Sequence, residues 1–237
     1  MLLLRAVLAC LYDIHGNLPA LDAALADARS AGADRWVLGG DYALFGGWPL
    51  ETVTRLRELE PALWIRGNGE RWTARPDDAP EGDPVQGAIA ACRAELGDDV
   101  VDDLASLPFD ASIDDTGIVH ASPVSDVRSF LPQPGDDEAE LLEGVDAARL
   151  IFGHTHLPFR RISVRDGIEL VNPGSVGMPF DGDPRAAYAL VHDDGAVEHR
   201  RVAYDHAASA AQVRERFERA PWTSTVTARI EQARVAV

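Results

Sequence analysis

LLLRAVLACLY, residues 2–12, runs directly into Asp13-Ile14-His15-Gly16-Asn17. An apolar run this continuous is typical of a central strand that is buried on both faces of its sheet. Asn17 is then expected to cap a helix whose apolar residues recur at helical spacing and which Gly32 closes. The order of strand, acidic loop and helix predicts the beginning of an α/β sandwich.

Four later segments repeat this pattern of an apolar run that ends in polar side chains. The runs cover residues 35–38, 62–66, 113–121 and 149–152, and the polar groups that close them are Gly39-Gly40-Asp41, Gly67-Asn68-Gly69-Glu70, His120 and Gly153-His154-Thr155-His156. Taken alone, Asn68 fits a left-handed turn, and the His-Thr-His segment fits a polar turn after a buried strand. Because ligands of α/β sheets bind beyond the carboxyl ends of strands, we expect the whole set to converge.

The chemistry of this set is that of metal ligands. His154 and His156 lie two residues apart, so both rings leave an extended segment on the same face. Neutral imidazole suits zinc, iron, manganese and nickel, and added carboxylate and amide oxygens favour the harder ions of that group. The candidate ligands exceed the need of one tetrahedral ion and suit two ions that share a ligand. They are Asp13, His15, Asp41, Asn68, His120, His154 and His156.

The rest of the chain is expected to complete one domain, residues 1–237. A helix should begin at Pro49 and stop near Pro61, and another should cover residues 136–145. Residues 71–110 are rich in proline and acid, carry two helical patterns, and are expected to form a helical excursion that shapes substrate access.

Two hairpins and a helical tail follow. The predicted strand pairs are 159–164 with 168–171 and 186–191 with 196–202, each joined by an Asp-Gly turn. A C-terminal helical tail is expected over about 206–237, with a break at Pro221. Its apolar residues could pack on the same chain or on a partner.

The charge balance excludes several kinds of site. All 22 basic residues are arginine, against 39 acidic residues, for a formal net charge of −17. A Schiff-base enzyme, a pyridoxal-phosphate enzyme and a Walker-type nucleotide site each need a lysine that this chain lacks. A groove for long nucleic acids needs clustered positive charge, so none is expected. A small anionic substrate is compatible with the charge if bound cations supply a local positive field.

Cysteine usage and hydropathy indicate the compartment. No apolar run approaches the length of a membrane span, and no separate basic region precedes the N-terminal apolar run. Cys10 and Cys92 lie in apolar surroundings without metal-ligand spacing, which predicts buried free thiols in a reducing compartment. We therefore expect a cytoplasmic protein with no membrane partner.

Read in order, the motifs resemble those of the calcineurin-like metallophosphoesterases, especially their small bacterial phosphodiesterase branch. The family signature of Asp-x-His, Gly-Asp, Gly-Asn, a histidine and Gly-His-x-His spans almost the whole chain, as Asp13/His15, Gly40-Asp41, Gly67-Asn68, His120 and Gly153-His154-Thr155-His156. The resemblance implies an α/β fold, a four-layer α-β-β-α sandwich of two mixed sheets flanked by helices.

The resemblance also implies roles for the candidate ligands. Two divalent metal ions, Mn, Fe, Ni or Zn, would be bound. The first would be held by Asp13, His15 and His156, the second by Asn68, His120 and His154, and Asp41 would bridge both. By the same resemblance, Asp41, Asn68 and His120 are the candidate catalytic residues.

The implied function is a metal-dependent phosphodiesterase that hydrolyses small phosphodiesters or nucleotides through a metal-bound hydroxide. One departure bears on the rate: much of the family has a histidine directly after the Gly-Asn asparagine, thought to protonate the leaving oxygen, where this chain has Gly69. A missing proton donor can cost roughly 10²–10⁴-fold in rate, so we expect a preference for good leaving groups or a donor such as Glu70 or His206. The small bacterial branch often lacks this histidine too.

Two other functions stay open. A phosphomonoesterase, phosphoprotein or dinucleoside-polyphosphate hydrolase fits less well with the missing histidine and the acidic surface. A non-catalytic protein-binding scaffold on the same fold, as in the retromer subunit that resembles the family, fits less well with the complete ligand set. Asn172 and the Gly174-Ser175 backbone fit a substrate contact or a structural turn equally well.

Overall fold

Strand β1 (Val7–Leu11) lies at the centre of a sheet and is buried along its whole length. The structure is a computed structural model that describes residues 7–82 and 84–235, so residues 2–6 of the predicted first strand and 236–237 of the predicted tail lie outside the described residues. Alternate side chains of β1 enter two different cores: Val7, Ala9 and Leu11 pack under helices, whereas Leu8 and Cys10 face the second sheet. A continuous apolar run was therefore the correct signal for a strand covered on both sides.

The first sheet has the order β10-β9-β1-β2-β3. Its parallel half consists of β1, β2 (Arg35–Leu38) and β3 (Ala62–Trp64). The predicted hairpin of β9 (Ala186–His192) and β10 (Val197–Val202) is confirmed and pairs antiparallel with β1. The sheet is therefore mixed, and its three parallel strands point their carboxyl ends to one edge.

The second sheet has the order β4-β5-β6-β8-β7 and is also mixed. Strands β5 (Thr116–Val119), β6 (Arg149–Ile151) and β8 (Glu169–Asn172) are parallel. The edge strands β4 (Asp110–Ile113) and β7 (Phe159–Ile162) pair antiparallel with β5 and β8. The hairpin predicted over 159–171 is confirmed. The strand predicted over 113–121, crossing a turn at Asp114–Gly117, is a hairpin that begins earlier, at Asp110, and turns at Asp114 and Asp115.

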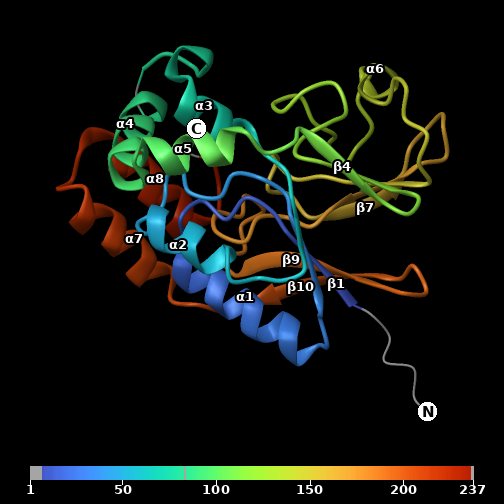
Figure 1. Ribbon diagram of the computed structural model, residues 1–237, viewed down its shortest axis with the longest axis horizontal. Coiled ribbons are helices and arrows are strands. Elements are labelled where there is room, and N and C mark those ends of the chain that lie inside the picture. The colour runs from blue at the N-terminus through green and yellow to red at the C-terminus, as the bar shows by residue number, and fades with distance from the viewer. Residues whose placement is uncertain (1–6, 83, 236–237) are drawn as a thin grey trace.

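The two sheets pack face to face through a small apolar core to which both contribute, including Cys10, Val37, Ile118 and Ile151. Tyr12 ties them further, because its hydroxyl donates to the Ile151 carbonyl at 3.1 Å. Figure 1 shows most helices gathered on the side of the first sheet, and α6 with β4 and β7 on the other. The predicted α/β sandwich of two mixed sheets flanked by helices is confirmed.

Helices cover the first sheet and fill the predicted excursion. Helix α1 begins at a cap that was predicted, since the Asn17 side chain accepts from Ala20 N. The excursion holds two helices of the predicted pattern and one that the sequence did not reveal, α3, in which Asn68 is the first helical residue rather than a left-handed turn. The bounds are α1 (Leu18–Ser30), α2 (Pro49–Leu56), α3 (Asn68–Ala74), the 3₁₀ turn η1 (Pro76–Asp78), α4 (Val85–Leu96) and α5 (Asp98–Ala105).

On the second sheet the helical cover is thin. The helix predicted over 136–145 is reduced to α6 (Glu138–Leu141). Its acidic side chains pair with arginines of other segments, Glu138 with Arg161 and Glu140 with Arg128, and Gly144 adopts φ +76°, which does not continue a helix.

The C-terminal segment packs on its own chain. Helices α7 (His206–Arg216) and α8 (Pro221–Gln232) contact each other, and Trp222, Val226 and Ile230 of α8 are buried in the core under the first sheet. The two cysteines are buried free thiols as predicted, and burial raises the pKa of each to about 12. Within the described ranges, no helix is long and apolar enough to cross a membrane.

Candidate metal centre

All the predicted ligands lie at the carboxyl ends of strands, where the edges of the two sheets meet. The loops after β1, β2 and β3 supply Asp13, His15, Asp41 and Asn68, and those after β5 and β6 supply the remaining histidines. Backbone hydrogen bonds join these loops directly: His15 N donates to Asp41 O at 2.9 Å, and Gly153 N donates to His120 O at 2.7 Å. Six of the side chains are buried, and His154 is half-buried.

The backbone of the centre is strained. Five of the candidate ligands adopt a left-handed φ between 49° and 67°, a region that non-glycine residues rarely occupy: Asp13, His15, Asp41, His154 and His156. Each such residue costs about 1–3 kcal/mol and persists only where the surrounding structure enforces it. Strain concentrated on one set of polar side chains indicates a functional site.

His15 and His156 point their unprotonated nitrogens at each other. Nδ1 of His15 donates to the Leu44 carbonyl at 3.0 Å, and Nδ1 of His156 donates to the Met178 carbonyl at 2.5 Å. A neutral imidazole carries one hydrogen, so each Nε2 has a free lone pair. These two Nε2 atoms lie 3.1 Å apart. Two lone pairs at that distance repel unless a cation lies between them or beside them.

His120, Asn68 and His154 form a second convergence of the same kind. Nδ1 of His120 donates to the Gly39 carbonyl at 2.8 Å, which leaves its Nε2 without a hydrogen. The side-chain amide of Asn68 lies 3.0 Å from that Nε2 and 2.8 Å from Nδ1 of His154. With its NH2 group toward the rings this amide donates to both of them, and with its oxygen toward the same point it can serve as a metal ligand beside them.

Asp13 connects the two groups. Its Oδ2 accepts from His154 N at 2.9 Å, whereas its buried Oδ1 has no hydrogen-bond partner among the described residues. That Oδ1 lies 3.6 Å from Nε2 of His156 and 3.9 Å from Nε2 of His120. Two sets therefore have ligand atoms close enough for one ion each, Asp13 with His15 and His156, and Asp13 with Asp41 and His120. Asp13 is as well placed as Asp41 to bridge two ions.

The protonation states suit cations. Burial lowers the pKa of His15 and of His154 to about 3, and it also lowers the pKa of His120 and His156. These rings are neutral at pH 7 and keep a lone pair for a metal. Burial and the neighbouring Asp41 carboxylate raise the pKa of Asp13 well above its usual range. A bound cation would reverse that effect, so the donor set fits divalent metal ions.

Gly67 and Gly69 shape the cradle around Asp41. A Cβ on Gly67 would lie 2.4 Å from Oδ1 of Asp41, and one on Gly69 would lie 2.7 Å from the same atom. Gly69 N donates to this Oδ1 at 2.6 Å. Gly69 therefore holds Asp41 through its backbone N–H group, in a space that a side chain would narrow.

Gly69→Ala is expected to weaken metal binding without unfolding the protein. The added methyl group pushes Asp41 out of line, and displacing a group that orients a ligand typically costs roughly 10–100-fold in metal affinity. Titration with Mn²⁺ by calorimetry measures this loss. Gly135→Ala, an exposed position whose added Cβ would meet only the flexible Asp137 side chain, controls for the effect of replacing a glycine. Unchanged Mn²⁺ affinity in Gly69→Ala would mean that Asp41 is not a ligand.

Separate replacement of His154 and His156 is expected to empty different sites. His156 belongs to the group around His15, and His154 lies beside Asn68. In each alanine variant the content should fall from two metal ions toward one, with the remaining ion at the other group. Metal analysis with Mn²⁺ paramagnetic resonance distinguishes the two sites. Loss of both ions from each variant would contradict this division.

Glu70 and His206, the two predicted proton donors, do not face the centre with a free polar group. Both oxygens of Glu70 accept backbone hydrogen bonds, from Asp41 N and Gly67 N on one side and Tyr42 N on the other, so this carboxylate clamps two ligand loops together. His206 lies beside Tyr204 at the start of α7. Neither has the free contact with the centre that a proton donor needs.

From the sequence, Asn172 and Ser175 fitted either a substrate contact or a structural turn. In the structure they form a structural turn. The Asn172 amide donates to Gly153 O and Thr155 Oγ1, each at 3.0 Å, and Ser175 Oγ donates to Asp13 O at 2.7 Å. Both side chains are fully buried. They brace the backbone on either side of the ligands.

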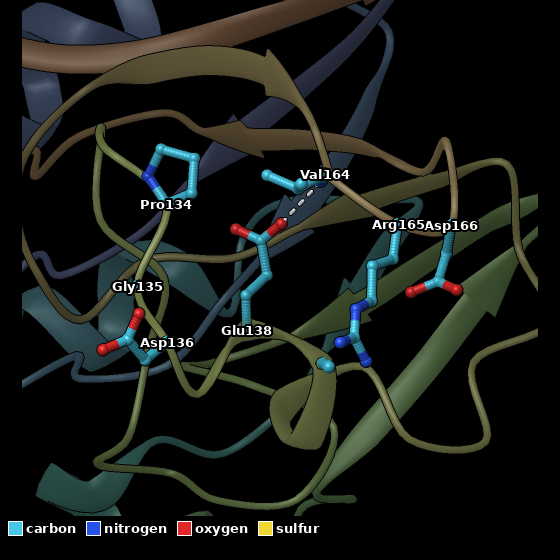
Figure 2. A pocket seen from close by; sticks show the side chains of 8 residues that line it. Pro134, Gly135, Asp136, Glu138, Val164, Arg165 and Asp166 are labelled. Carbon is cyan, nitrogen blue, oxygen red and sulfur yellow. Dashed lines mark hydrogen bonds between the residues drawn. The ribbon is translucent and has the colours of Figure 1, made fainter.

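Two hollows of the surface differ in chemistry. The larger, about 310 Å³, lies between α6 and the β7–β8 turn; Figure 2 shows Glu138 there, where it accepts from Val164 N at 2.8 Å, with Arg165 and Asp166 beside it. It contains none of the predicted ligands. The smaller, about 200 Å³, opens onto His15, Asp41, Asn68, His154 and His156. Its other walls, which the sequence did not single out, are Phe45, Trp72, Val85, Met178, Phe180 and Arg229.

Comparison with known proteins agrees with this geometry. A model of the calcineurin-like phosphoesterase superfamily domain matches residues 7–195. The chain belongs to this superfamily. It is accordingly a phosphoesterase, and the resemblance of its motifs to that family is confirmed.

Individual relatives extend the match to most of the chain. An uncharacterised protein of Methanocaldococcus jannaschii is 29% identical over 226 residues, which cover 86% of this chain and 90% of that protein. A metallophosphoesterase from Sphaerobacter thermophilus superposes with a TM-score of 0.81 at 28% identity, over 96% of this chain and 99% of that one. A hypothetical protein from Pyrococcus horikoshii has the same fold, with a TM-score of 0.83 at 21% identity over 98% and 100% of the two chains.

Proposed function

We propose that this phosphoesterase is a dinuclear metal-dependent phosphodiesterase that hydrolyses small phosphodiester or nucleotide substrates in the cytoplasm. The observation that carries the proposal is the pair of facing lone pairs on the Nε2 atoms of His15 and His156, which lie 3.1 Å apart. This arrangement is unfavourable without a cation.

The proposed ligand assignment follows these groups. Asp13, His15 and His156 would hold one ion, Asn68, His120 and His154 would hold the other, and Asp41 would serve both. Bound divalent cations polarise phosphate oxygens, lower the pKa of water and stabilise the charge that develops at phosphorus. Manganese, iron, nickel and zinc all accept this mixture of imidazole and oxygen ligands.

The residues of the chain fix the ligands before substrate arrives. The carbonyls of Leu44, Gly39 and Met178 each accept a hydrogen from an Nδ1 atom and so set the tautomer of a ligand ring. Phe45 and Phe180 pack against His15 and His156 and keep water from that side of the rings. The candidate catalytic residues Asp41, Asn68 and His120 line the same convergence.

A diester is favoured over a monoester by the charge of the cavity. Among the described residues that line it, Arg229 is the single cationic side chain apart from the histidines. A phosphodiester carries one negative charge at neutral pH, whereas a monoester carries nearly two and commonly requires more cationic donors. The rest of the acidic surface disfavours long nucleic acids as substrates.

A substrate panel tests the proposal. The purified protein is reconstituted with Mn²⁺, Ni²⁺ or Zn²⁺ and assayed with bis(p-nitrophenyl) phosphate, p-nitrophenyl phosphate and cyclic nucleotides. Faster hydrolysis of the diesters is expected. Faster hydrolysis of the monoester would support the phosphomonoesterase alternative. Absence of bound metal together with absence of hydrolysis would support a scaffold.

The rate is expected to depend steeply on the leaving group. Gly69 supplies no acid, and both oxygens of Glu70 are engaged by backbone N–H groups, so the departing oxygen leaves with little protonation. A series of aryl methyl phosphates with increasing phenol pKa measures this dependence. A rate that stays flat across the series would show that a general acid is present.

A further inference from the structure

The cavity beside the metal centre has apolar walls that start at the ligand rings themselves. Phe180 stacks on His156 with ring centroids 4.3 Å apart and planes inclined by 15°. Phe45 packs on His15 at 5.7 Å. Val85 and Met178 extend the apolar surface. At about 200 Å³, the cavity is below the roughly 300–1,000 Å³ typical for drug-sized ligands, so it suits one ring and a phosphate.

Two hydrogen-bond donors in these walls are unused. Nε of Arg229 and Nε1 of Trp72 are buried atoms that find no acceptor in residues 7–82 and 84–235. Trp72 follows Asn68 by one helical turn on α3, so both side chains lie on the same face of that helix. Buried donors are nearly always paired in native proteins, and two unpaired ones on one cavity indicate an acceptor that arrives with a ligand.

Arg229 is not explained by packing. The buried face of α8 is formed by its neighbours, including Val226 and Ile230, and an apolar residue at position 229 would close the cavity without the cost of desolvating a charge. The chain has 39 acidic residues, and comparable arginines have used them: Arg216 contacts Glu51 and Glu95, and Arg200 contacts Asp27. Arg229 instead faces the metal centre.

The charge of Arg229 acts on that centre. Arg229 lines the same cavity as His15, Asp41 and His156. A guanidinium at this place raises the local positive field where an anion must enter. It is the kind of group that binds phosphate oxygens through directed N–H donors.

We infer that this cavity is a substrate subsite in which Arg229 and Trp72 donate hydrogen bonds to a phosphate oxygen and Phe45, Val85 and Phe180 contact a flat aromatic substituent of the same phosphoester. The substrate class is then a phosphoester that carries a flat aromatic group close to the phosphate, as an aryl ester does. The inference rests on the proposed function, since the subsite serves the same phosphoester, and it assigns a substrate contact to the C-terminal helix α8.

Binding of phosphonates, which the enzyme does not hydrolyse, tests the subsite. Phenylphosphonate and methylphosphonate are titrated by calorimetry into Mn²⁺-loaded protein. Phenylphosphonate should bind the wild type roughly 5- to 150-fold more tightly, the range for stacking one aromatic ring. Arg229→Gln should weaken both ligands roughly ten- to a hundredfold, because each loses a charge-assisted hydrogen bond. Arg229→Lys should restore part of the loss.

A matched control distinguishes direct contact of Arg229 with the ligand from the long-range effect of its charge. Arg234 is exposed on the same C-terminal segment, so Arg234→Gln removes an equal charge outside the cavity and should leave both affinities within about twofold of the wild type. Equal weakening by Arg229→Gln and Arg234→Gln would overturn the inference. So would equal affinities of the wild type for the phenyl and methyl ligands.

The Trp72 indole gives a readout that needs no variant of Arg229 to fold and no turnover. In ¹⁵N-labelled protein, the indole N–H signal of Trp72 is assigned by its loss in Trp72→Phe. This signal should shift on addition of phenylphosphonate. The signal of Trp36, which lies on β2 outside the cavity, should stay in place. An unmoved Trp72 signal at saturating ligand would overturn the inference. If diesters are not hydrolysed but Arg229-dependent binding is found, the proposed phosphodiesterase activity is wrong and the subsite stands.

Discussion

Asp13→Asn is expected to lower kcat/KM for bis(p-nitrophenyl) phosphate by at least roughly 10²–10³-fold, the scale of losing one preorganised electrostatic group. The same change should remove most of the bound metal, because Oδ1 of Asp13 lies within reach of both histidine groups. The metal-free variant should nevertheless be at least as stable as metal-free wild type. Its amide oxygen can still accept from His154 N, and its amide N–H can donate to a bare Nε2.

Loss of metal and of activity without loss of metal-free stability would distinguish a metal-ligating carboxylate from a structural one. Metal content by mass spectrometry, kcat/KM and thermal unfolding of both forms are the measurements. Asp34→Asn is a matched control, since Oδ1 of Asp34 accepts from Val7 N at 3.1 Å at the far end of β1. If Asp13→Asn lowered the stability of the metal-free protein and left the metal content unchanged, Asp13 would have a structural role.

Removal of metal by a chelator is expected to abolish hydrolysis and to lower Tm by roughly 10–20 °C. Two ions, each present at about 100 times its Kd, stabilise the folded state by about 2.7 kcal/mol each, and about 2–4 °C is lost per kcal/mol in a chain of this size. The structural reason is the repulsion among the ligands that remain, chiefly between the Nε2 atoms of His15 and His156.

Calorimetric unfolding before and after dialysis against EDTA checks this expectation, and re-addition of Mn²⁺ should restore both activity and Tm. Asp13→Asn provides the internal comparison, because its Tm should change little on chelation. Full hydrolysis by a protein with far less than one metal ion per chain would refute the dinuclear proposal.

The candidate ligands were predictable because their signals are local. Each follows an apolar run that forms a strand by its own composition, and in α/β sheets the carboxyl ends of parallel strands meet at one edge. Thus β1, β2 and β3 bring Asp13, Asp41 and Asn68 together without any knowledge of side-chain packing. The lack of lysine and the acidic composition excluded other chemistries in the same direct way.

The helices of the outer layers were less predictable. Helix α3 has no apolar period that distinguishes it from a turn, and its capping residue Glu70 accepts not only from Gly67 N of the same helix but also from Asp41 N and Tyr42 N of another loop. Helix α6 is shorter than its apolar spacing indicated, since Glu138 and Glu140 pair with arginines of other segments and Gly144 adopts a left-handed φ. In both places contacts or charges from outside the local pattern prevail.

The sequence by itself determined the α/β class, the polar ends of the strands and the set of candidate ligands, since each depends on neighbours within a few residues. Only the tertiary structure decided how these ligands are oriented: the tautomers of His15, His120 and His156 are fixed by carbonyls remote in sequence. It alone places Arg229 of the last helix in one cavity wall with Trp72. Such contacts arise when separate layers pack together, and no local propensity encodes which side chains will meet there.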